Sequence, residues 1–409
     1  MTEKIAKPQL RFAGFDDTWE QRKLGEVGTT YTGLSGKTKE DFGHGNGQFV
    51  TYMNVFSNPV GLPDMTEAVE IDDSQNKVLF GDVLFTTSSE TPEEVGMSSV
   101  WLENAENTYL NSFCFGYRPT VEFNPYYLAY MLRSSSMRKK ITFLAQGISR
   151  YNISKNKMMD IEIPIPKIEE QKQIGSYFRN LDNLITLHQR KYDKLTNVKK
   201  SMLEKMFPKN GSNVPEIRFK GFSDAWEQRK VTELGKIYIG LVTTMTKHYT
   251  NEGTLLIRNS DIKDGRFEFG DTPIYLENTF AQENESRMHQ IGDVITVHTG
   301  DVGTSAVITE NEAKSIGFAT IVTRPDTQII VPNYLCTFLN TDKHKRWAVA
   351  ISTGDGRTNY NLGDYYELVV PVPSIREQQA ISSFVQNLNN LITLHQREST
   401  YFTGGFYAE

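Results

Sequence analysis

Apolar residues recur with a coiled-coil spacing in one long stretch of the chain. Alternating steps of four and three residues from Ile174 meet a mainly apolar series with two polar interruptions: Phe178, Leu181, Ile185, His188, Tyr192, Leu195, Lys199, Met202 and Met206. This heptad pattern predicts a helix from about Lys167 to Phe207, which Pro208 ends. Such a long apolar seam needs an equally long partner to cover it.

The chain contains one unit of sequence twice. Residues 8–28, PQLRFAGFDDTWEQRKLGEVG, return at 215–235 with 13 of 21 positions identical, and residues 164–190 return at 371–397. Both pairs of blocks are 207 residues apart. Two copies of one long unit therefore follow each other, unlike the many short periods of a solenoid.

The second copy predicts a second long helix, which we expect to pair antiparallel with the first about a pseudo-twofold axis. It begins at a capping box formed by Ser374 and Glu377. Its seam continues through Ile381, Leu388, Ile392 and His395. The two copies diverge from Glu398 on, and the second copy has two glycines from Gly404 where the helix of the first copy continues. We therefore expect the helix in residues 374–409 to be truncated or altered from about 398.

Between the repeated blocks, hydrophobic residues come in short runs. Turn-forming residues separate TYMNVF, KVLFGDVLFTT and NSFCFGYRP in the first copy, and TLLIRNSDI, GDVITVHTG and GFATIVTRP in the second, which is typical of β-strands. Helical segments are predicted at about 125–144 and 332–350. The predicted fold is α+β: two β-rich domains, separated by a pair of long antiparallel coiled-coil helices. The domains span 1–166 and 209–373, and the helices lie in 167–208 and 374–409.

Composition narrows the class of protein. No apolar stretch among the 409 residues reaches the roughly 18 residues of a membrane span, and the start MTEKIAKPQL lacks the apolar core of a signal peptide. We therefore expect a cytoplasmic protein without a membrane partner. Cys114 and Cys336 are too few for a disulfide framework, and we predict two buried thiols.

The net charge of −6 means that nucleic acid could be bound only through a local surplus of Lys and Arg. One stretch of 27 residues in the first copy has such a surplus and contains no Asp or Glu: Arg133, Arg138, Lys139, Lys140, Arg150, Lys155 and Lys157. In the second copy, acidic neighbours offset Lys343, Lys345, Arg346 and Arg357. Taken alone, the stretch fits either a phosphate-binding patch or a solvated helix face.

Motifs that would indicate catalysis are incomplete. The stretch from Gly33 to Thr38 imitates a phosphate-binding loop, but Tyr31 stands where its first glycine is needed. His298 and Asp301 have no partner at metal-ligand spacing. We expect neither an active site nor a metal site on this chain. His188 and His395 are interpreted as seam residues near the crossing of the helices rather than as ligands.

The duplicated order of motifs resembles the specificity subunit of type I restriction-modification systems. The resemblance covers nearly the whole chain. It depends on the Ile-Pro-x-Pro endings followed by Glu170-Gln171 and Glu377-Gln378, on the Gly-Asp-Val-Leu run from Gly81, and on the run from Arg258 to Ile262. It also depends on Gly147 and Gly354, each followed three residues later by an arginine.

The resemblance implies a function for each part of the chain. Each variable domain would be a target recognition domain that reads one half of a bipartite double-stranded DNA target. The paired helices would dock two modification (methyltransferase) subunits, and restriction (endonuclease/translocase) subunits would join them. The chain itself would be non-catalytic and carry no cofactor, because the methyl donor, ATP and Mg²⁺ would be bound by those partners.

The hypothesis names candidate residues for these contacts. In the first lobe the candidates are Asn54, the loop after the Gly-Asp-Val strand and part of the basic stretch: Ser88, Ser89, Glu90, Arg138, Lys139, Lys140, Arg150, Lys155 and Lys157. In the second lobe they are Arg258, Asn259, His298, Thr299, Asp301, Lys345, Arg346 and Arg357. The partner-docking helices contribute Glu170, Gln171, Leu181, Ile185, His188, Glu377, Gln378, Leu388, Ile392 and His395.

Two other classes of function remain open at this point. A non-catalytic two-headed scaffold, in which the coiled coil spaces two lobes that bind protein or glycan, agrees with the net acidity. The acid-free basic stretch and the retention of one helix beside dissimilar lobes argue against it. An enzyme that acts by itself lacks a recognisable set of catalytic residues.

Overall fold

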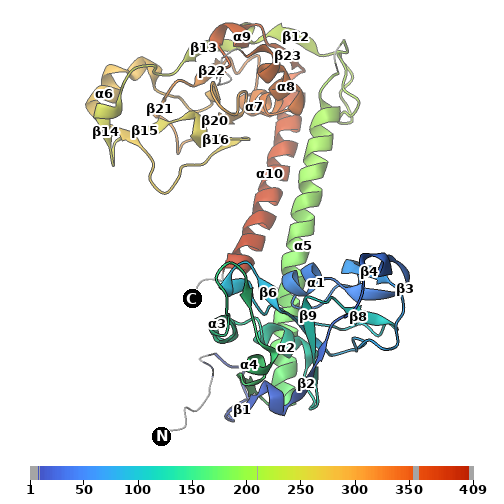
Figure 1. Cartoon of the computed structure of the whole chain (residues 1–409). Helices are drawn as coiled ribbons and strands as arrows, with labels where there is room; N and C mark the ends of the chain where they lie inside the picture. The colour runs from blue at the N-terminus through green and yellow to red at the C-terminus, as the bar shows by residue number, and fades with distance from the viewer. Residues whose placement is uncertain (1–7, 9, 210, 353–358, 405–409) are drawn as a thin grey trace. The chain divides into compact units, whose positions relative to one another are not determined.

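The computed structural model describes residues 8, 10–209, 211–352 and 359–404 (Figure 1). The chain divides into two compact units, residues 1–185 and 186–409. Each unit contains a mixed lobe of strands and short helices, and the boundary between the units lies within the long helix α5 (Ile168–Met206). Within the described ranges, no helix combines the length and hydropathy that crossing a membrane requires.

Lobe 1 (Glu20–Ile165) is built on two small sheets. The larger has the order β2-β9-β5-β7, with β2 at Gly28–Thr32, β9 at Cys114–Pro119, β5 at Val83–Thr86 and β7 at Ser98–Val100. The other has the order β4-β3-β8, with β4 at Thr66–Val69, β3 at Phe42–Val50 and β8 at Thr108–Leu110. Two ladders complete the lobe, β1 (Glu20–Lys23) with β11 (Glu162–Ile165) and β6 (Ser88–Ser89) with β10 (Tyr151–Asn152). Its helices are α1 (Tyr52–Ser57), α2 (Pro125–Met131), α3 (Ser135–Phe143) and α4 (Lys155–Met159).

Lobe 2 (Glu227–Val372) repeats this plan. One four-stranded antiparallel sheet has the order β13-β22-β19-β20, with β13 at Gly235–Ile239, β22 at Ile321–Pro325, β19 at Val294–Thr296 and β20 at Ser305–Val307. A second sheet has the order β14-β18-β15-β21, with β14 at Tyr249–Thr250, β18 at Tyr275–Leu276, β15 at Thr254–Ile257 and β21 at Ile316–Gly317. The ladders pair β12 (Glu227–Lys230) with β23 (Val369–Val372) and β16 (Ile262–Lys263) with β17 (Arg266–Phe267). Its helices are α6 (Asn278–Glu283), α7 (Pro332–Leu339), α8 (Asp342–Ile351) and α9 (Leu362–Tyr366).

The predicted α+β repeat is confirmed, with local corrections. The TYMNVF run is wrong as a strand: it forms α1, because the Thr51 hydroxyl accepts a hydrogen bond from the backbone N–H of Asn54 and caps a helix there. Each predicted helical segment is a pair of helices, α2 with α3 and α7 with α8. Between α7 and α8, Thr341 accepts a hydrogen bond from the N–H of His344 and starts the second helix of the pair. Both cysteines are buried thiols, as predicted.

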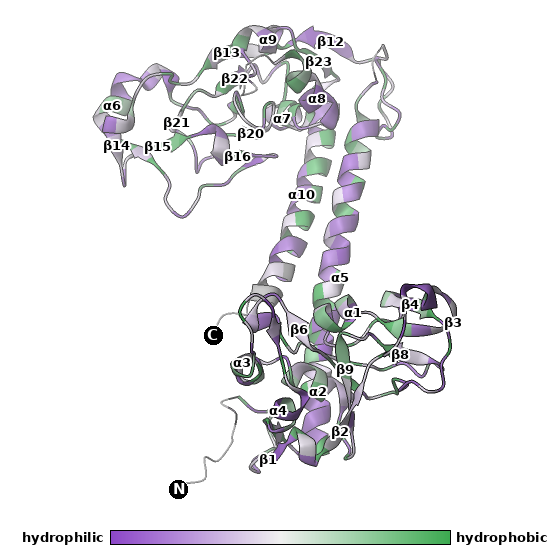
Figure 2. Ribbon diagram, viewed as in Figure 1, coloured by the Kyte–Doolittle hydropathy of each residue, from purple (hydrophilic) through white to green (hydrophobic). Residues whose placement is uncertain are grey.

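The two long helices follow the predicted heptad. Helix α5 has 39 residues and α10 (Ile375–Gly404) has 30, so α10 remains helical through Glu398 as far as Gly404. All nine seam residues from Ile174 to Met202 are partly buried, while most of their neighbours on α5 are exposed. Figure 2 shows the resulting mixture of apolar and polar positions along both helices.

Within residues 186–409, the end of α5 and the helix α10 run antiparallel (Figure 1). Leu203 and Met206, near the end of α5, pack in one core with Ile381 and Val385, near the start of α10. Farther along, the Nδ1 atoms of His188 and His395 lie 3.0 Å apart. The histidines therefore face each other at the helix contact, where the heptad pattern placed them.

A largely buried ion pair joins the segment just before each lobe to the start of the long helix that follows the lobe. Arg11 binds both carboxylate oxygens of Glu170, at 2.6 and 2.7 Å, and the carboxylate is 1 % exposed. Arg218 binds Glu377 in the same way, at 2.7 and 2.8 Å. Bidentate contact with an arginine compensates the desolvation of a carboxylate better than a single hydrogen bond does. The pair also modifies the predicted capping box: Ser374 accepts from the N–H of Glu377, but the Glu377 side chain turns to Arg218.

The adjacent glutamines complete both joints. The side-chain oxygen of Gln171 accepts a hydrogen bond from the N–H of Asn124 at 3.0 Å, and its amide donates to the carbonyl of Pro166. Gln378 makes the equivalent contacts with the N–H of Val331 at 2.7 Å and with a proline carbonyl. The Glu-Gln sequence therefore holds the lobe onto the helix.

We predict that replacing Glu377 with Gln destabilises lobe 2. The change keeps the shape of the side chain but leaves the Arg218 guanidinium without its anion, which should cost roughly 2–4 kcal/mol of unfolding free energy. Urea denaturation of the whole chain measures the loss. Glu367→Gln is the matched control, because Glu367 pairs with Lys230 on the surface of the same lobe and should change stability by less than about 1 kcal/mol. Equal effects of the two substitutions would contradict the importance of the buried pair.

The lobes should also differ in their response to acid. Burial lowers the pKa of His289 and of His344 in lobe 2 to about 4. An unfolded histidine titrates near 6.5, so between pH 6.5 and 4 the unfolded lobe binds more protons and stability falls as the pH falls. Lobe 1 has a single histidine, His44, whose pKa is raised by the Glu40 carbonyl and then by the Glu70 carboxylate. Its effect therefore has the opposite sign.

Hydrogen exchange of the whole chain at pH 7 and pH 5, corrected for intrinsic rates, tests this difference. We expect the strands β19 and β22 of lobe 2 to lose more protection than β5 and β9 of lobe 1. The expected loss of unfolding free energy between pH 7 and pH 5 is roughly 1–3 kcal/mol per buried histidine. Equal losses in the two lobes would contradict the prediction.

Candidate nucleic-acid interface

In lobe 1, strand pairing brings two distant segments together. The ladder of β6 with β10 pairs Ser88 with Asn152 and Ser89 with Tyr151. The N–H of Ile153 also donates to the carbonyl of Thr87 at 3.0 Å. The loop after the Gly-Asp-Val strand (residues 87–91) therefore lies beside residues 146–153 of the basic stretch, and we call these two segments the paired loops of lobe 1.

Lobe 2 contains the same pairing. Thr299 forms a bridge with Asn359, and the N–H of Tyr360 donates to the carbonyl of His298 at 2.8 Å. The described paired loops of lobe 2 are residues 298–302 and 359–360. These two contacts of lobe 2 are the counterparts of Ser88–Asn152 and Thr87–Ile153 in lobe 1, with the first segment shifted by 211 residues and the second by 207.

A buried aspartate positions the strand before each loop. Asp82 accepts two hydrogen bonds from the Arg118 guanidinium, at 2.8 and 2.7 Å, and a third from the Tyr31 hydroxyl. In lobe 2, Asp293 is bound by Arg324 in the same way, at 2.8 and 2.7 Å. Hydrogen bonding to Asp82 raises the pKa of Arg118, and burial raises that of Tyr31. The aspartate of the Gly-Asp-Val run is therefore a structural residue that supports the loop.

The second segment of lobe 1 depends on a glycine. Gly147 has a φ of 150°, and a Cβ at this position would lie 2.0 Å from the carbonyl oxygen of Arg150. The spacing of glycine and arginine in the sequence thus marks a tight turn, closed by two hydrogen bonds between Gln146 and Asn152. Asn152 and its counterpart Asn359 were missed as candidates, although both follow the repeated Gly-x-x-Arg pattern by two residues.

The loop candidates of lobe 1 differ in exposure. Glu90 is exposed, whereas Ser88 and Ser89 are 5 % and 8 % exposed and belong to the ladder. Ser89 donates to the Glu94 carboxylate. Asn54 is fully buried and its amide binds backbone groups of Leu62. Side chains occupied in this way have no free edge for a ligand, so Glu90 is the accessible member.

In lobe 2 the loop candidates are partly engaged with one another. His298 and Thr299 are half-buried, and the Thr299 hydroxyl donates to Asn359 at 2.8 Å. Partial burial lowers the pKa of His298. Asp301 is exposed and accepts from the Thr304 hydroxyl.

The other two polar candidates of lobe 2 have structural contacts. The Arg258 guanidinium binds Asp261 at 3.0 and 2.7 Å. Asn259 accepts from the N–H of His298 at 2.8 Å and donates to the carbonyls of two residues before β22. Asn259 thereby links the loop at His298 to the segment before β22, so its role is structural.

The basic stretch separates into supporting and accessible residues. Arg138 donates to the carbonyls of Glu93, Val95 and Gly96, and burial lowers its pKa. Lys140 donates to a carbonyl of β11 at 2.7 Å. The remaining positive candidates are more accessible, with Lys155 half-buried and three side chains exposed: Lys139, Arg150 and Lys157. In lobe 2, Lys345 is half-buried and Arg346 exposed, while Arg357 lies outside the described residues.

The docking candidates fall into two groups. Glu170, Gln171, Glu377 and Gln378 are buried in the joints between lobe and helix, so they have no surface to offer a partner. The seam candidates are partly buried or, at Leu388, 8 % exposed: Leu181, Ile185, His188, Leu388, Ile392 and His395. Any docking face must therefore consist of their exposed neighbours on the same helices.

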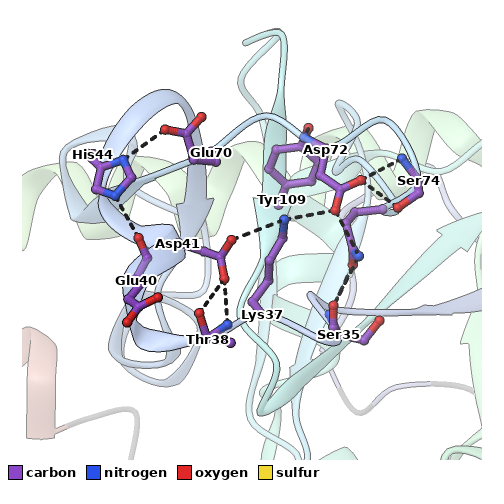
Figure 3. A network of polar contacts seen from close by, with 11 residues as sticks. Ser35, Lys37, Thr38, Glu40, Asp41, His44, Glu70, Asp72, Ser74 and Tyr109 are labelled. Carbon is purple, nitrogen blue, oxygen red and sulfur yellow. Dashed lines mark hydrogen bonds and ion pairs between the residues drawn. The ribbon is translucent and has the colours of Figure 1, made fainter.

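The segment that imitates a phosphate-binding loop belongs to a polar network in lobe 1 (Figure 3). Lys37 binds Asp72 at 2.9 Å, and the Thr38 hydroxyl donates to Asp41. Contacts with Ser74 and Lys37 hold the pKa of Asp72 far below its usual range. The lysine is thus held by carboxylates rather than presented to a phosphate.

Comparison with known proteins identifies the family. The model of the type I restriction modification DNA specificity domain matches residues 16–197 and again 223–400. The chain is 22 % identical over 391 residues to a putative type I restriction enzyme MjaX specificity subunit of Methanocaldococcus jannaschii, covering 93 % of this chain and 89 % of the relative. It is also 22 % identical to the type I restriction enzyme StySPI specificity subunit of Salmonella potsdam, covering 90 % and 82 %.

Solved structures share the fold. The type I restriction-modification system S subunit from M. genitalium aligns over 98 % of this chain and 97 % of its own, with a TM-score of 0.55 and 14 % identity. A chain from a study of complex assembly and conformational transition of the type I R-M system aligns equally well, with 18 % identity. The two family matches include both lobes and most of both long helices. This chain therefore belongs to the type I restriction-modification DNA specificity family, a non-catalytic family, and carries its domain twice.

Proposed function

We propose that each lobe reads one half of a bipartite double-stranded DNA target through its paired loops. The observation that carries this proposal is the repeated loop pairing. The same backbone contacts recur in both lobes, while the side chains around them differ: residues 87–91 are Thr-Ser-Ser-Glu-Thr and residues 298–302 are His-Thr-Gly-Asp-Val. A constant support for variable polar side chains suits the reading of different base edges in the major groove.

The division of labour within the chain follows from this function. Residues 1–166 and 209–373 are the target recognition domains, and the helices of 167–208 and 374–409 dock partners. We propose two modification subunits per chain, since the repeat offers two similar docking faces, and restriction subunits that join this complex. The methyl donor, ATP and Mg²⁺ belong to those partners, and the complex acts on DNA in the cytoplasm. The family match gives no support to the scaffold hypothesis.

The main experiment maps methylated adenines in cells that contain this chain and its modification subunit. We expect a two-part target with a fixed run of unread bases. Glu90→Ala should relax discrimination at a base pair of one half-site by roughly 5- to 150-fold, because a carboxylate accepts a hydrogen bond from cytosine. Asp301→Ala should do the same at the other half-site. Glu106→Ala removes an exposed carboxylate elsewhere in lobe 1 and should change neither.

Loss of both half-sites from either single substitution would contradict this placement of the readout. A gel shift with and without the modification subunit tests the function more broadly. If no specific DNA were retained in either state, DNA recognition by this chain would be refuted.

A second prediction concerns phosphate contacts. Replacing Lys139, Arg150 and Lys157 together with Gln should weaken binding to all sequences. The slope of log affinity against log salt should fall by up to about 0.9 for each lost contact, while base preference survives. Arg138→Gln removes the same kind of charge from a supporting position, so it should lower stability and leave the salt slope unchanged. A slope unaltered by the triple substitution would remove these residues from the interface.

A further inference from the structure

Three potential metal ligands converge where α5 meets α10, within residues 186–409. The Nδ1 atoms of His188 and His395 are 3.0 Å apart. One carboxylate oxygen of Glu398 lies 2.7 Å from the first of these nitrogens and 3.3 Å from the second. Two imidazole nitrogens and one carboxylate oxygen therefore form a small triangle. Among the described residues, this is the one group of three or more His, Cys, Asp or Glu side chains gathered closely enough to hold an ion.

Protons alone satisfy this triangle poorly. All three atoms lie within 3.3 Å of one another, and a neutral imidazole can carry its single proton on only one of its nitrogens. If the Nδ1 of His188 donates a proton to Glu398, the Nδ1 of His395 has two choices. It shares that proton as a second acceptor, or it carries a proton of its own that lies close to the first. A single cation at the centre can interact with all three atoms at once.

The spacing suits a small divalent transition-metal ion. Zinc binds histidine nitrogen and carboxylate oxygen at about 2.0–2.2 Å, so two ligand atoms around a tetrahedral ion are roughly 3.3 Å apart. The edges of the triangle, 2.7 to 3.3 Å, require shifts of a few tenths of an ångström to reach that geometry. Two neutral imidazoles and one carboxylate carry a charge of −1, which a divalent ion more than compensates.

The surroundings permit entry of an ion. The side chains of His188 and His395 are each 15 % exposed and that of Glu398 is 37 % exposed. The ligands are thus held by packing between the helices, yet one side remains open to solvent. A water molecule could occupy the fourth position of a tetrahedral ion there.

The internal repeat supplies only part of this site. His188 and His395 are equivalent residues of the two copies, but the counterpart of Glu398 in the first copy is Lys191. His395 and Glu398 are three residues apart on α10 and therefore share one face of the helix. Glu398 directly follows the repeated block 371–397, where the second copy departs from the first. The heptad pattern includes the two histidines but not Glu398, so it indicated only two seam histidines.

We propose that His188, His395 and Glu398 bind one Zn²⁺ ion that clamps α5 to α10. The apolar contact of the two helices around Leu203 and Ile381 lies well away along the pair. From His188 to Leu203 the axial distance along α5 is about 22 Å at 1.5 Å per residue. The ion holds the helices together at this distance from the apolar core.

The test uses the untagged full chain, treated with a chelator and then titrated with Zn²⁺ by calorimetry. We expect one ion per chain and a rise in thermal stability that grows with the zinc concentration. His188→Asn, His395→Asn and Glu398→Lys, which copies the residue of the first repeat, should each weaken the affinity at least tenfold. Each variant should also lose the thermal shift. Cobalt in place of zinc gives a visible spectrum that reports four-coordination directly.

His248→Asn is the matched control. His248 lies 3.0 Å from Glu277 in a histidine–carboxylate pair of the same unit, so its loss removes a similar surface pair without touching the triangle. Its zinc affinity should equal that of the wild type. Circular dichroism of every variant establishes that the helices are intact. Two results would overturn the proposal. One is the absence of stoichiometric binding at about 100 micromolar zinc, and the other is wild-type affinity in either histidine variant.

Discussion

The rest of the chain depends on one bidentate ion pair in each copy. It joins an arginine near the start of the copy to a buried glutamate at the start of the long helix. Arg11 and Glu170, like Arg218 and Glu377, are 159 residues apart in sequence. The ladder of β1 with β11, or of β12 with β23, closes the same joint. The beginning and end of each lobe are therefore fixed to each other and to the helix. Most of the chain between them takes no part in that closure.

The elements that could be predicted from the sequence are those with a long-range pattern. The heptad identified α5 within one residue at each end and marked the residues that are partly buried. The repeat predicted two β-rich lobes, and one four-stranded sheet has the same strand order in both. Local propensity was less reliable. The run at Thr51–Phe56 is rich in β-forming residues, yet a single threonine cap makes it helical.

The candidate site was only partly accessible to sequence reasoning, because exposure and hydrogen-bond occupancy depend on tertiary contacts. Asn54 and Asn259 have side chains that can read a base edge, but their amides form hydrogen bonds with backbone groups instead. Arg138 has the charge of a phosphate ligand but supports a neighbouring turn. Glu90 and Arg150 were predicted separately, and only the ladder of β6 with β10 reveals that their segments are neighbours. In each case contacts that form only in the folded lobe determine the role.

The four-residue difference between the two shifts that superpose the paired loops has a consequence for chain length. Lobe 2 has four more residues than lobe 1 before its Gly-Asp-Val strand and four fewer between that strand and the second loop segment, yet the same bonds form. The entropy of closing a flexible segment grows only with the logarithm of its length, by roughly 0.6 kcal/mol per doubling. Insertions and deletions of a few residues are therefore nearly neutral for this closure. The anchoring strands set the geometry of the paired loops. The segments between these strands can therefore change in length as the surface of the lobe changes.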